Sequence, residues 1–399
     1  MRFSRRTDWN TEESELARAH RLRAQAGLPI ADLTASNPTR CGFEYSPELL
    51  AGLTDQRALD YDPQPRGSLR GREAVCGYYA DHGVAVEPEQ IVLTTSTSEA
   101  YSYLFRLLCD PGSEILVAQP GYPLFDFLAV LDDVRLKAAP LVYDHVWQID
   151  PEGFRRAITP ETRAVVLVHP NNPTGHFTKP WEAEELARLA REFDLSLIVD
   201  EVFLDYGFGG GGKSFAAGLD GVPVFVVSGL SKIAGLPQMK AAWIVAAGPE
   251  AGRALDRLEV IADTFLSMNA PVQCALPAWL GGRAAIQEQI GERVAANLAE
   301  LDRQLSRLAA VRRLEVEGGW YAVLRIPALA PDERTVLALL EHGVWVHPGY
   351  FFGMAESGWL VVSLLGPEGE FSAGVTVLVD YLETHQGSNN TGLKLQASL

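Results

Sequence analysis

Short apolar runs rich in β-branched residues alternate with amphipathic segments from about residue 91 to residue 245, and this alternation restricts the fold more than any other feature. Strands that alternate with helices in this way build a mostly parallel sheet with helices on both faces. We therefore expect an α/β fold. The expected strands are 91–95, 114–118, 164–169, 195–202, 222–228 and 241–246.

The rest of the chain predicts a second, smaller α+β unit. A long charged helix is expected at 284–309, followed by strands at 321–326, 344–347 and 359–365 with a helix between the first two. With 399 residues the chain exceeds the size at which one hydrophobic core stops growing. We expect an N-terminal arm belonging to the small domain (1–44), a large α/β domain (45–265), a small domain (266–385) and a flexible tail (386–399).

The N-terminal arm carries one predicted helix, at 10–26. Asn10 is its expected N-cap, Glu13 closes a capping box and Gly27 ends the helix. Asp8, Glu12 and Glu13 stand where a signal peptide would need an apolar stretch, so we expect no export signal.

Charge and cysteine usage narrow the class of partner. A net charge of −17 argues against nucleic acid, because binding a phosphate backbone needs a basic surface. No apolar run approaches the roughly 18 residues that cross a bilayer. The cysteines form no C-x-x-C pair, which suits reduced thiols in a cytoplasm rather than a metal site. We expect a cytoplasmic protein with a small-molecule partner; the cysteines are Cys41, Cys76, Cys109 and Cys274.

A hydroxyl-rich segment between a strand and a helix is a candidate anion site. In Thr94-Thr95-Ser96-Thr97-Ser98-Glu99-Ala100 the free N–H groups and the positive end of the helix dipole would face an anion. Taken alone, the segment is more typical of an ordinary N-cap. In Pro120-Gly121-Tyr122-Pro123 an aromatic ring follows a strand and could lie flat on a ring-shaped cofactor, although a lone loop aromatic more often packs.

Three further residues follow expected strands. Asn172 lies in the turn Pro170-Asn171-Asn172-Pro173-Thr174-Gly175, at the sheet edge where open α/β sheets bind ligands. Asp200 ends an apolar strand, and a buried carboxylate requires a cationic partner. Lys232, after Ser231, follows the next strand and could be that partner.

Taken together and in this order, these segments resemble the class I/II aminotransferases, enzymes of fold type I that depend on pyridoxal 5′-phosphate (PLP). The resemblance covers nearly the whole chain, from Ser36-Asn37-Pro38 to the C-terminal unit. Its most specific motifs are Asn171-Asn172-Pro173-Thr174-Gly175, Asp200-Glu201-Val202-Phe203 and Gly229-Leu230-Ser231-Lys232.

The resemblance implies a role for each residue. Lys232 would carry PLP as a Schiff base, Asp200 would pair with the pyridinium nitrogen, and Tyr122 would stack on the ring. Asn172 would donate to the ring 3-oxygen and, with Asn37 and Arg40, contact the substrate. Because the family is typically dimeric, a homodimer acting on an amino acid and a 2-oxo acid is implied. The phosphate would be bound by Ser96, Thr97, Ser98 and Lys240 and reached by Tyr61 of the neighbouring subunit, while Ser231 and Phe203 would also contact the cofactor.

Three positions depart from the family pattern. Phe203 replaces a tyrosine that donates to the 3-oxygen, and Lys240 replaces a phosphate-binding arginine. Val361 stands where the arginine that binds the substrate carboxylate is expected. Arg40 is the first candidate for that missing charge, with Arg6 and Arg325 as alternatives.

Other functions remain open at this point. Elimination, decarboxylation, cyclisation or oxidation would use the same cofactor site, since the fold does not decide the reaction. A non-catalytic regulator with a PLP fold is a further alternative, but the chain carries no appended DNA-binding domain. The segment from Gly207 to Ser214 formally fits the P-loop pattern of nucleotide-binding proteins, which needs a strand before its glycines and a full helix after them.

Overall fold

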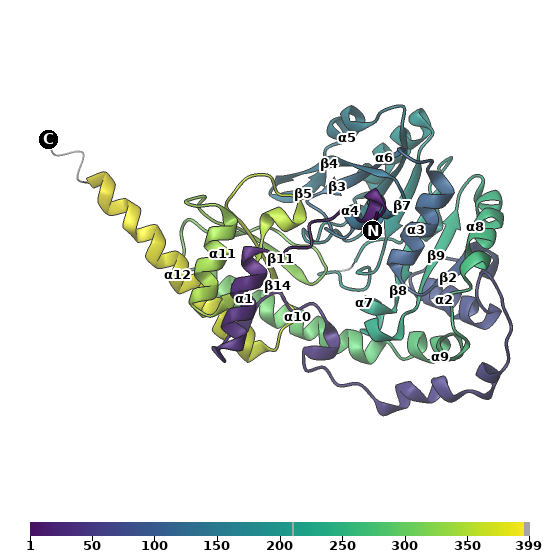
Figure 1. Cartoon of the computed structure of the whole chain (residues 1–399), viewed down its shortest axis with the longest axis horizontal. Helices are drawn as coiled ribbons and strands as arrows, with labels where there is room; N and C mark the ends of the chain where they lie inside the picture. Colours follow the sequence, from purple (N-terminus) through teal and green to yellow (C-terminus); the bar gives the residue numbers. More distant parts are fainter. Residues whose placement is uncertain (210, 395–399) are drawn as a thin grey trace.

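The computed structural model describes residues 1–209 and 211–394, and side chains as far as residue 385. An eight-stranded sheet with the order β2-β9-β8-β7-β6-β3-β4-β5 forms the centre of the larger part of the molecule (Figure 1). Six strands run parallel to one another, whereas β9 and the edge strand β5 run antiparallel to their neighbours. The strands are β2 Ile91–Thr94, β3 Glu114–Gln119, β4 Arg135–Asp144, β5 Val146–Ile149, β6 Thr162–Val168, β7 Ser196–Asp200, β8 Val224–Gly229 and β9 Ala242–Ala247.

Helices cover both faces of this sheet, as the apolar strands predict. Along β7, Leu197 and Val199 join one core cluster, which includes residues of α6 (Pro180–Phe193). Ile198 points the other way, into a cluster with residues of α3 (Thr97–Leu108) and α8 (Ala251–Phe265). Because side chains alternate across a strand, a run apolar at every position has to be buried on both sides.

Two strands of the sheet were not predicted from the sequence. β4 is exposed at several positions and carries Arg135, Lys137 and Asp144, which hide the apolar periodicity. β5 pairs with the far end of β4 as an antiparallel hairpin, with Tyr143 opposite Trp147. Both lie at the edge of the sheet, where water satisfies charged side chains.

A second sheet has the order β10-β11-β14-β13, and β1 pairs separately with β12. The expected helix between the first two C-terminal strands is α11. The long charged helix is α10, which ends at Leu305 rather than at residue 309. The strands are β1 Ala31–Asp32, β10 Arg312–Arg313, β11 Tyr321–Arg325, β12 Val344–Trp345, β13 His347–Pro348 and β14 Trp359–Ser363; the helices are α10 Ala284–Leu305, α11 Asp332–Glu341 and α12 Glu368–Lys394.

The N-terminal helix begins later than predicted. α1 spans Glu15–Gln25, and its N-cap is Ser14, whose side chain accepts a hydrogen bond from the Ala17 N–H. Asn10 instead closes a local turn, and Glu13 pairs with Arg21. A serine directly before the first helical residue offers the cap geometry that Asn10, four residues before that serine, does not.

Residues before α1 cross from the second sheet to the first. Arg6 pairs with Asp133 at 3.4 Å, and the Trp9 ring packs edge-on against Phe127 at 5.8 Å between ring centroids. Figure 1 shows the N-terminus beside α4 (Phe125–Leu131), a helix that comes about a hundred residues after α1 in the sequence.

The C-terminal segment and the glycine-rich segment complete the comparison with the predicted elements. The predicted tail, 386–399, overlaps α12 as far as Lys394, and its last five residues lie outside the described part. Gly207 forms a bridge with Gly318, and only the three-residue turn Phe215–Ala217 follows the glycines, so the P-loop context is absent from the described residues of this segment. No helix within 1–209 and 211–394 is long and apolar enough to cross a bilayer.

Candidate active site

The carboxyl ends of three neighbouring parallel strands bring the predicted polar residues together. β7 lies between β6 and β8, so the turn after β6, the end of β7 and the turn after β8 open on one edge of the sheet. These segments carry Asn172, Asp200 and Lys232 respectively. Open α/β sheets bind ligands at this edge.

Lys232 lies in the short helix α7 (Leu230–Ile233), which starts directly after β8. Its backbone carbonyl accepts a hydrogen bond from the Tyr206 hydroxyl at 2.7 Å. Its Nζ atom lies 4.9 Å from the centroid of the Trp320 ring and 5.6 Å from that of Phe203. Burial lowers the pKa of Lys232 to about 8, although the Asp200 charge opposes this shift. Near neutral pH the amine is therefore partly uncharged and able to act as a nucleophile.

Asp200 ends β7 and is only 6% exposed. Its Oδ1 accepts the Val202 N–H and its Oδ2 accepts the Tyr101 hydroxyl, both at 3.0 Å. Burial raises the pKa of Asp200 to about 6, against the effect of these two donors and of Lys232. A buried carboxylate with an unsatisfied preference for positive charge is suited to a cationic ligand group.

The expected anion site is the N-terminus of α3. Ser96 is the N-cap and accepts from the Glu99 N–H at 3.2 Å. Thr97 and Ser98 begin the helix and are half-buried. The Leu230 N–H bonds to the Ala241 carbonyl at 3.0 Å, which holds Lys240 close to the turn that carries Ser231. Lys240 has a φ of 53°, and its side chain is exposed.

Asn172 sits in a turn that is braced from several sides. Asn171 accepts the Thr174 hydroxyl at 2.8 Å through its side chain and bonds the Gly175 N–H at 2.7 Å through its carbonyl. Gly175 has a φ of 72°, and a Cβ there would stand 2.5 Å from the Gly318 oxygen, so the position requires glycine. The Asn172 Oδ1 atom is buried without a hydrogen-bond partner among the described residues.

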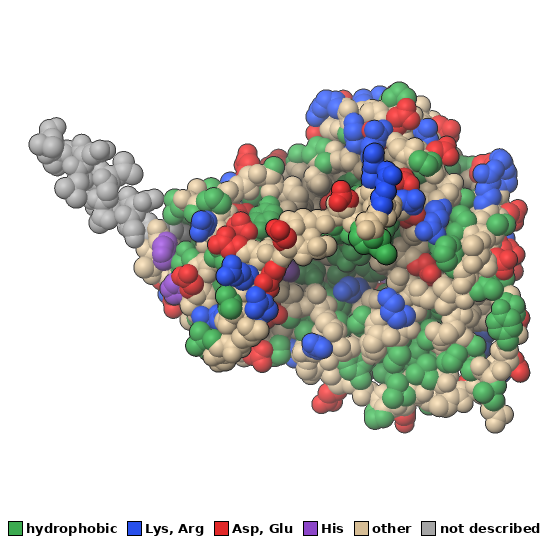
Figure 2. All heavy atoms as spheres, viewed as in Figure 1, with side chains coloured by type: hydrophobic (Ala, Val, Ile, Leu, Met, Phe, Trp, Pro, Cys, Tyr) green, Lys and Arg blue, Asp and Glu red, His purple; other side chains and the backbone are tan. Residues whose placement is uncertain are grey.

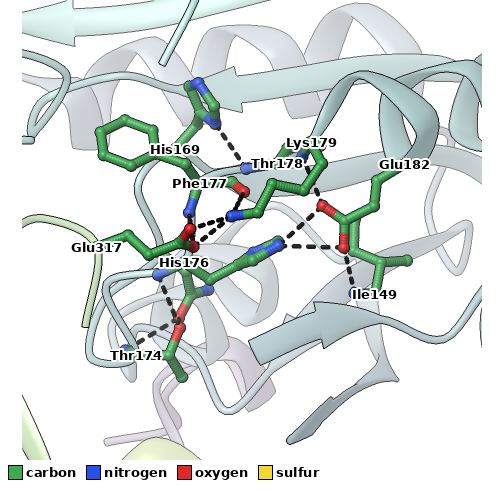
Figure 3. A network of polar contacts seen from close by, with 10 residues as sticks. Ile149, His169, Thr174, His176, Phe177, Thr178, Lys179, Glu182 and Glu317 are labelled. Carbon is green, nitrogen blue, oxygen red and sulfur yellow. Dashed lines mark hydrogen bonds and ion pairs between the residues drawn. The ribbon is translucent and has the colours of Figure 1, made fainter. Parts of the chain in front are cut away.

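A buried polar network holds this turn (Figure 3). The Glu182 carboxylate accepts from His176 Nε2 at 2.9 Å, from the Ile149 N–H at 2.7 Å and from the Lys179 N–H at 2.6 Å. Lys179 also pairs through Nζ with Glu317, three residues before Trp320. The network therefore ties the turn of Asn172 both to the first sheet and to the segment that leads into β11.

The two aromatic residues predicted to contact the cofactor, Tyr122 and Phe203, differ in their exposure to solvent. Tyr122 is 40% exposed and packs edge-on against Phe125, and burial followed by the Asp200 charge raises the pKa of its hydroxyl. Phe203 is buried and packs edge-on against Trp320 at 5.2 Å between ring centroids. No hydroxyl stands at position 203, as the sequence already indicated.

The candidate substrate residues differ in their availability. Asn37 caps the turn Pro38–Arg40 and accepts from Thr39, whereas the Arg40 side chain is exposed and has no polar partner among the described residues. Arg325 donates to the Ser357 and Gly358 carbonyls and stacks on Trp359. Arg6 pairs with Asp133. Of the three candidates, Arg40 is the one whose charge is uncommitted.

Two predicted positions lie apart from this cluster. Val361 is fully buried in β14, opposite Val323 and His347. Tyr61 is 84% exposed on a surface loop, in keeping with a residue expected to act on a neighbouring subunit.

Sequence reasoning missed three residues around Lys232 and Asp200: Tyr101, Tyr206 and Trp320. Tyr101 had a usable signal, because a tyrosine on the buried face of a helix needs a partner for its hydroxyl. Tyr206 and Trp320 reach Lys232 through tertiary packing alone. Tyr206 comes from a loop, and Trp320 directly precedes β11.

Known proteins resemble the chain over most of its length. A family model for aminotransferase class I and II matches residues 42–377. The aspartate/prephenate aminotransferase of Thermus thermophilus is 31% identical over 345 residues, covering 84% of this chain and 87% of that protein. The S-alkyl-thiohydroximate lyase SUR1 of Arabidopsis thaliana is 30% identical over 224 residues, covering 54% and 48%. The alanine aminotransferase structure from Pyrococcus furiosus has the same fold, with a TM-score of 0.88 at 23% identity over 96% of this chain and 100% of that one.

Proposed function

Because the chain belongs to the class I and II aminotransferases, a family of PLP-dependent transaminases, we propose that it transfers an amino group between a small amino acid and a 2-oxo acid, with PLP bound covalently to Lys232. The observation that carries the assignment is the placement of a half-buried lysine and a buried carboxylate at one sheet edge, where the charge of each acts on the pKa of the other.

The residues present fit PLP at several points. The Asn172 Oδ1 and Ser228 Oγ atoms are buried without a hydrogen-bond partner in the described part of the chain, so they are available to a ligand. The α3 N-terminus offers free N–H groups and the hydroxyls of Thr97 and Ser98 to a phosphate. Asp200 offers a negative charge to a protonated ring nitrogen, and Tyr122 offers an aromatic face.

Each side chain then has a defined task. When bound, PLP supplies an electron sink for the carbanion at the α-carbon of the substrate. Asp200 would keep the ring nitrogen protonated, since a buried carboxylate is strongly stabilised by an adjacent cation. Lys232 would anchor the cofactor, and its Nζ atom would accept and return a proton when the amine is free. With its pKa lowered to about 8 by burial, the free amine of Lys232 would lose its proton more readily than that of an exposed lysine.

A homodimer completes the proposed site. Tyr61 would reach the phosphate of the partner from its exposed loop. Leu50, Leu59 and Leu69 are also exposed, at 55%, 86% and 48%. Figure 2 shows hydrophobic side chains gathered over the region of α9 (Ala270–Gly281) and the adjoining segment, at the lower right. A second copy of the chain would cover this apolar face.

The proposal for the substrate side is that Arg40 binds the carboxylate. A free amino acid brings a negative charge into a partly dry pocket, and Val361 cannot pair with it. Arg40 has an uncommitted guanidinium and belongs to the segment that the resembling family places on the substrate side of the cofactor.

A second candidate is elimination from an amino acid at the same cofactor site. The valine at position 361 and the similarity to a lyase favour it. It differs from transamination in its products: elimination releases a leaving group, ammonia and a 2-oxo acid, without converting a second oxo acid to an amino acid.

Two measurements test the function. Borohydride reduction followed by peptide mapping should place the pyridoxyl group on Lys232, whereas labelling of Lys213 or Lys240 would overturn the assignment. Incubation with a panel of amino acids and 2-oxo acids, with products followed by mass spectrometry, should yield paired amino and oxo products. Release of a side-chain fragment instead would establish elimination.

A further inference from the structure

Tyr101 and Asp200 form a buried hydrogen bond to which the proposed roles above assign nothing. The Tyr101 hydroxyl donates to Asp200 Oδ2 at 3.0 Å, and the tyrosine is 2% exposed. Its ring packs against Phe125 at 4.9 Å and Phe105 at 6.0 Å between centroids. The apolar packing fixes the ring, so the hydroxyl has little freedom to seek another acceptor.

Within the described residues, the Asp200 carboxylate accepts hydrogen bonds from two donors. One is the Val202 N–H, which belongs to the next residues of the same turn and moves with Asp200. The other is Tyr101, which comes from a different element. Tyr101 is therefore the side chain that fixes the Oδ2 atom from outside β7.

The helix that carries Tyr101, α3, also carries the candidate phosphate site. The first residues of α3 form the candidate phosphate site, and Tyr101 lies four residues after Thr97 on the same helix. At about 1.5 Å of rise per residue, roughly 6 Å separates the two along the helix axis. One rigid element thus contacts both the phosphate end of the proposed site and the carboxylate at its ring-nitrogen end.

We propose that Tyr101 is a positioning residue that orients Asp200 toward the cofactor's ring nitrogen and keeps its carboxylate ionised, so that α3 sets the spacing between phosphate and ring. The inference rests on the proposed function, because it needs PLP in the site. It concerns a residue of this chain whose contribution acts through Asp200.

The expected direction follows from the electrostatics of the pair. A donor to a carboxylate stabilises the charged form, and burial already raises the pKa of Asp200. Removing the hydroxyl would raise that pKa further. As the pH is lowered, PLP affinity should fall when Asp200 becomes protonated, and we call this part of the titration the acid limb. In Tyr101→Phe the acid limb should lie about one pH unit higher than in wild type.

The experiment measures PLP affinity and the visible absorption of the bound cofactor as a function of pH, in wild type, Tyr101→Phe and Tyr103→Phe. Tyr103 is a matched control, because it is buried on the same helix but stacks on Phe265. The inference predicts that the limb moves in Tyr101→Phe alone. In an Asp200→Asn background, Tyr101→Phe should change PLP affinity less than twofold, since its effect acts through the carboxylate.

Equal titrations in wild type and Tyr101→Phe would overturn the inference, as would an undiminished effect in the Asp200→Asn background. If wild type failed to bind PLP, the proposed function itself would fail. This result differs from the two above, so failure of the function can be distinguished from failure of the inference. Should Tyr101→Phe not fold, 3-fluorotyrosine at position 101 keeps the ring and strengthens the donor. The limb should then move to lower pH, and an unmoved limb would refute the role.

Discussion

Replacing Glu182 tests whether the network in Figure 3 holds the turn that carries Asn172. Glu182 is fully buried, and its carboxylate accepts from three donors: His176 Nε2, the Ile149 N–H and the Lys179 N–H. Glu182→Ala removes the acceptor and leaves all three donors in a buried space. We expect the variant to lose both stability and affinity for PLP.

The magnitude follows from the number and type of bonds. A hydrogen bond to a charged group contributes about 1.5–3 kcal/mol, but three bonds to one carboxylate do not add fully. Each buried donor left without a partner costs about 1–3 kcal/mol, and because three such losses do not add fully we expect Glu182→Ala to cost about 3–5 kcal/mol. Glu182→Gln keeps the volume and one acceptor oxygen, so about 1–3 kcal/mol is expected.

The pH dependence gives a second, independent signature. Burial alone raises the pKa of Glu182, but the His176 bond and the two backbone donors outweigh it, so the folded-state pKa lies below its ordinary value. A carboxyl with a lowered pKa stabilises the fold above its unfolded-state pKa and loses that contribution as the pH falls through the folded-state pKa. The gap between wild type and Glu182→Gln should therefore narrow below about pH 4.5.

Urea denaturation followed by circular dichroism measures the effect, with PLP affinity measured on the same samples. Glu184→Ala is the control, because Glu184 is exposed on the same helix and makes no side-chain hydrogen bond or ion pair within the described residues. It should stay within about 0.5 kcal/mol of wild type. A loss below about 1 kcal/mol in Glu182→Ala would show that water or neighbouring groups replace the carboxylate, and the argument would be wrong.

Three further predictions address the site. Arg40→Ala should weaken binding of a carboxylate-bearing amino donor by about 1.5–3 kcal/mol while PLP remains bound, and full activity in this variant would refute the proposal. If Arg6→Ala and Arg325→Ala also left activity unchanged, the donor would be one whose carboxylate stays in solvent. Phe203→Tyr should lower the pH at which the bound cofactor's absorption changes, by restoring a donor to the deprotonated 3-oxygen; an unchanged titration would mean that this side chain does not face the ring. Burial raises the pKa of Glu201 to about 8, so wild type should lose stability from pH 5 to 8, and Glu201→Gln should flatten this slope; parallel pH profiles would contradict the assignment.

The elements that position the site were predictable because the middle of each strand is a continuous apolar run. β6, β7 and β8 are buried at every position except Arg163, so nearly every residue contributes to the signal. β4 and β5 were not predictable, since an edge hairpin with charged side chains resembles a loop. The start of α1 was misjudged because two capping residues, Asn10 and Ser14, compete within one turn and a half.

Within the site, motifs identified the residues that follow strands but not their partners. Asp200 could be predicted to need a positive group, and the charge of Lys232 acts on it in the fold. Its second partner, Tyr101, is 99 residues away in the sequence. A hydrogen bond between elements so far apart depends on how α3 packs against the sheet, which no local pattern encodes.

The structure also explains why this edge of the sheet should be stabilised by its ligand. Asp200 and Lys232 are both held in surroundings that favour their neutral forms, since burial raises the pKa of the carboxyl and lowers that of the amine. Buried polar atoms of Asn172 and Ser228 nearby lack partners among the described residues. Each of these features costs free energy in the unliganded fold. A ligand that brings a cationic ring nitrogen, a carbonyl for the amine and polar groups that pair with these two atoms would recover that cost, so binding and folding stability would be coupled at this site.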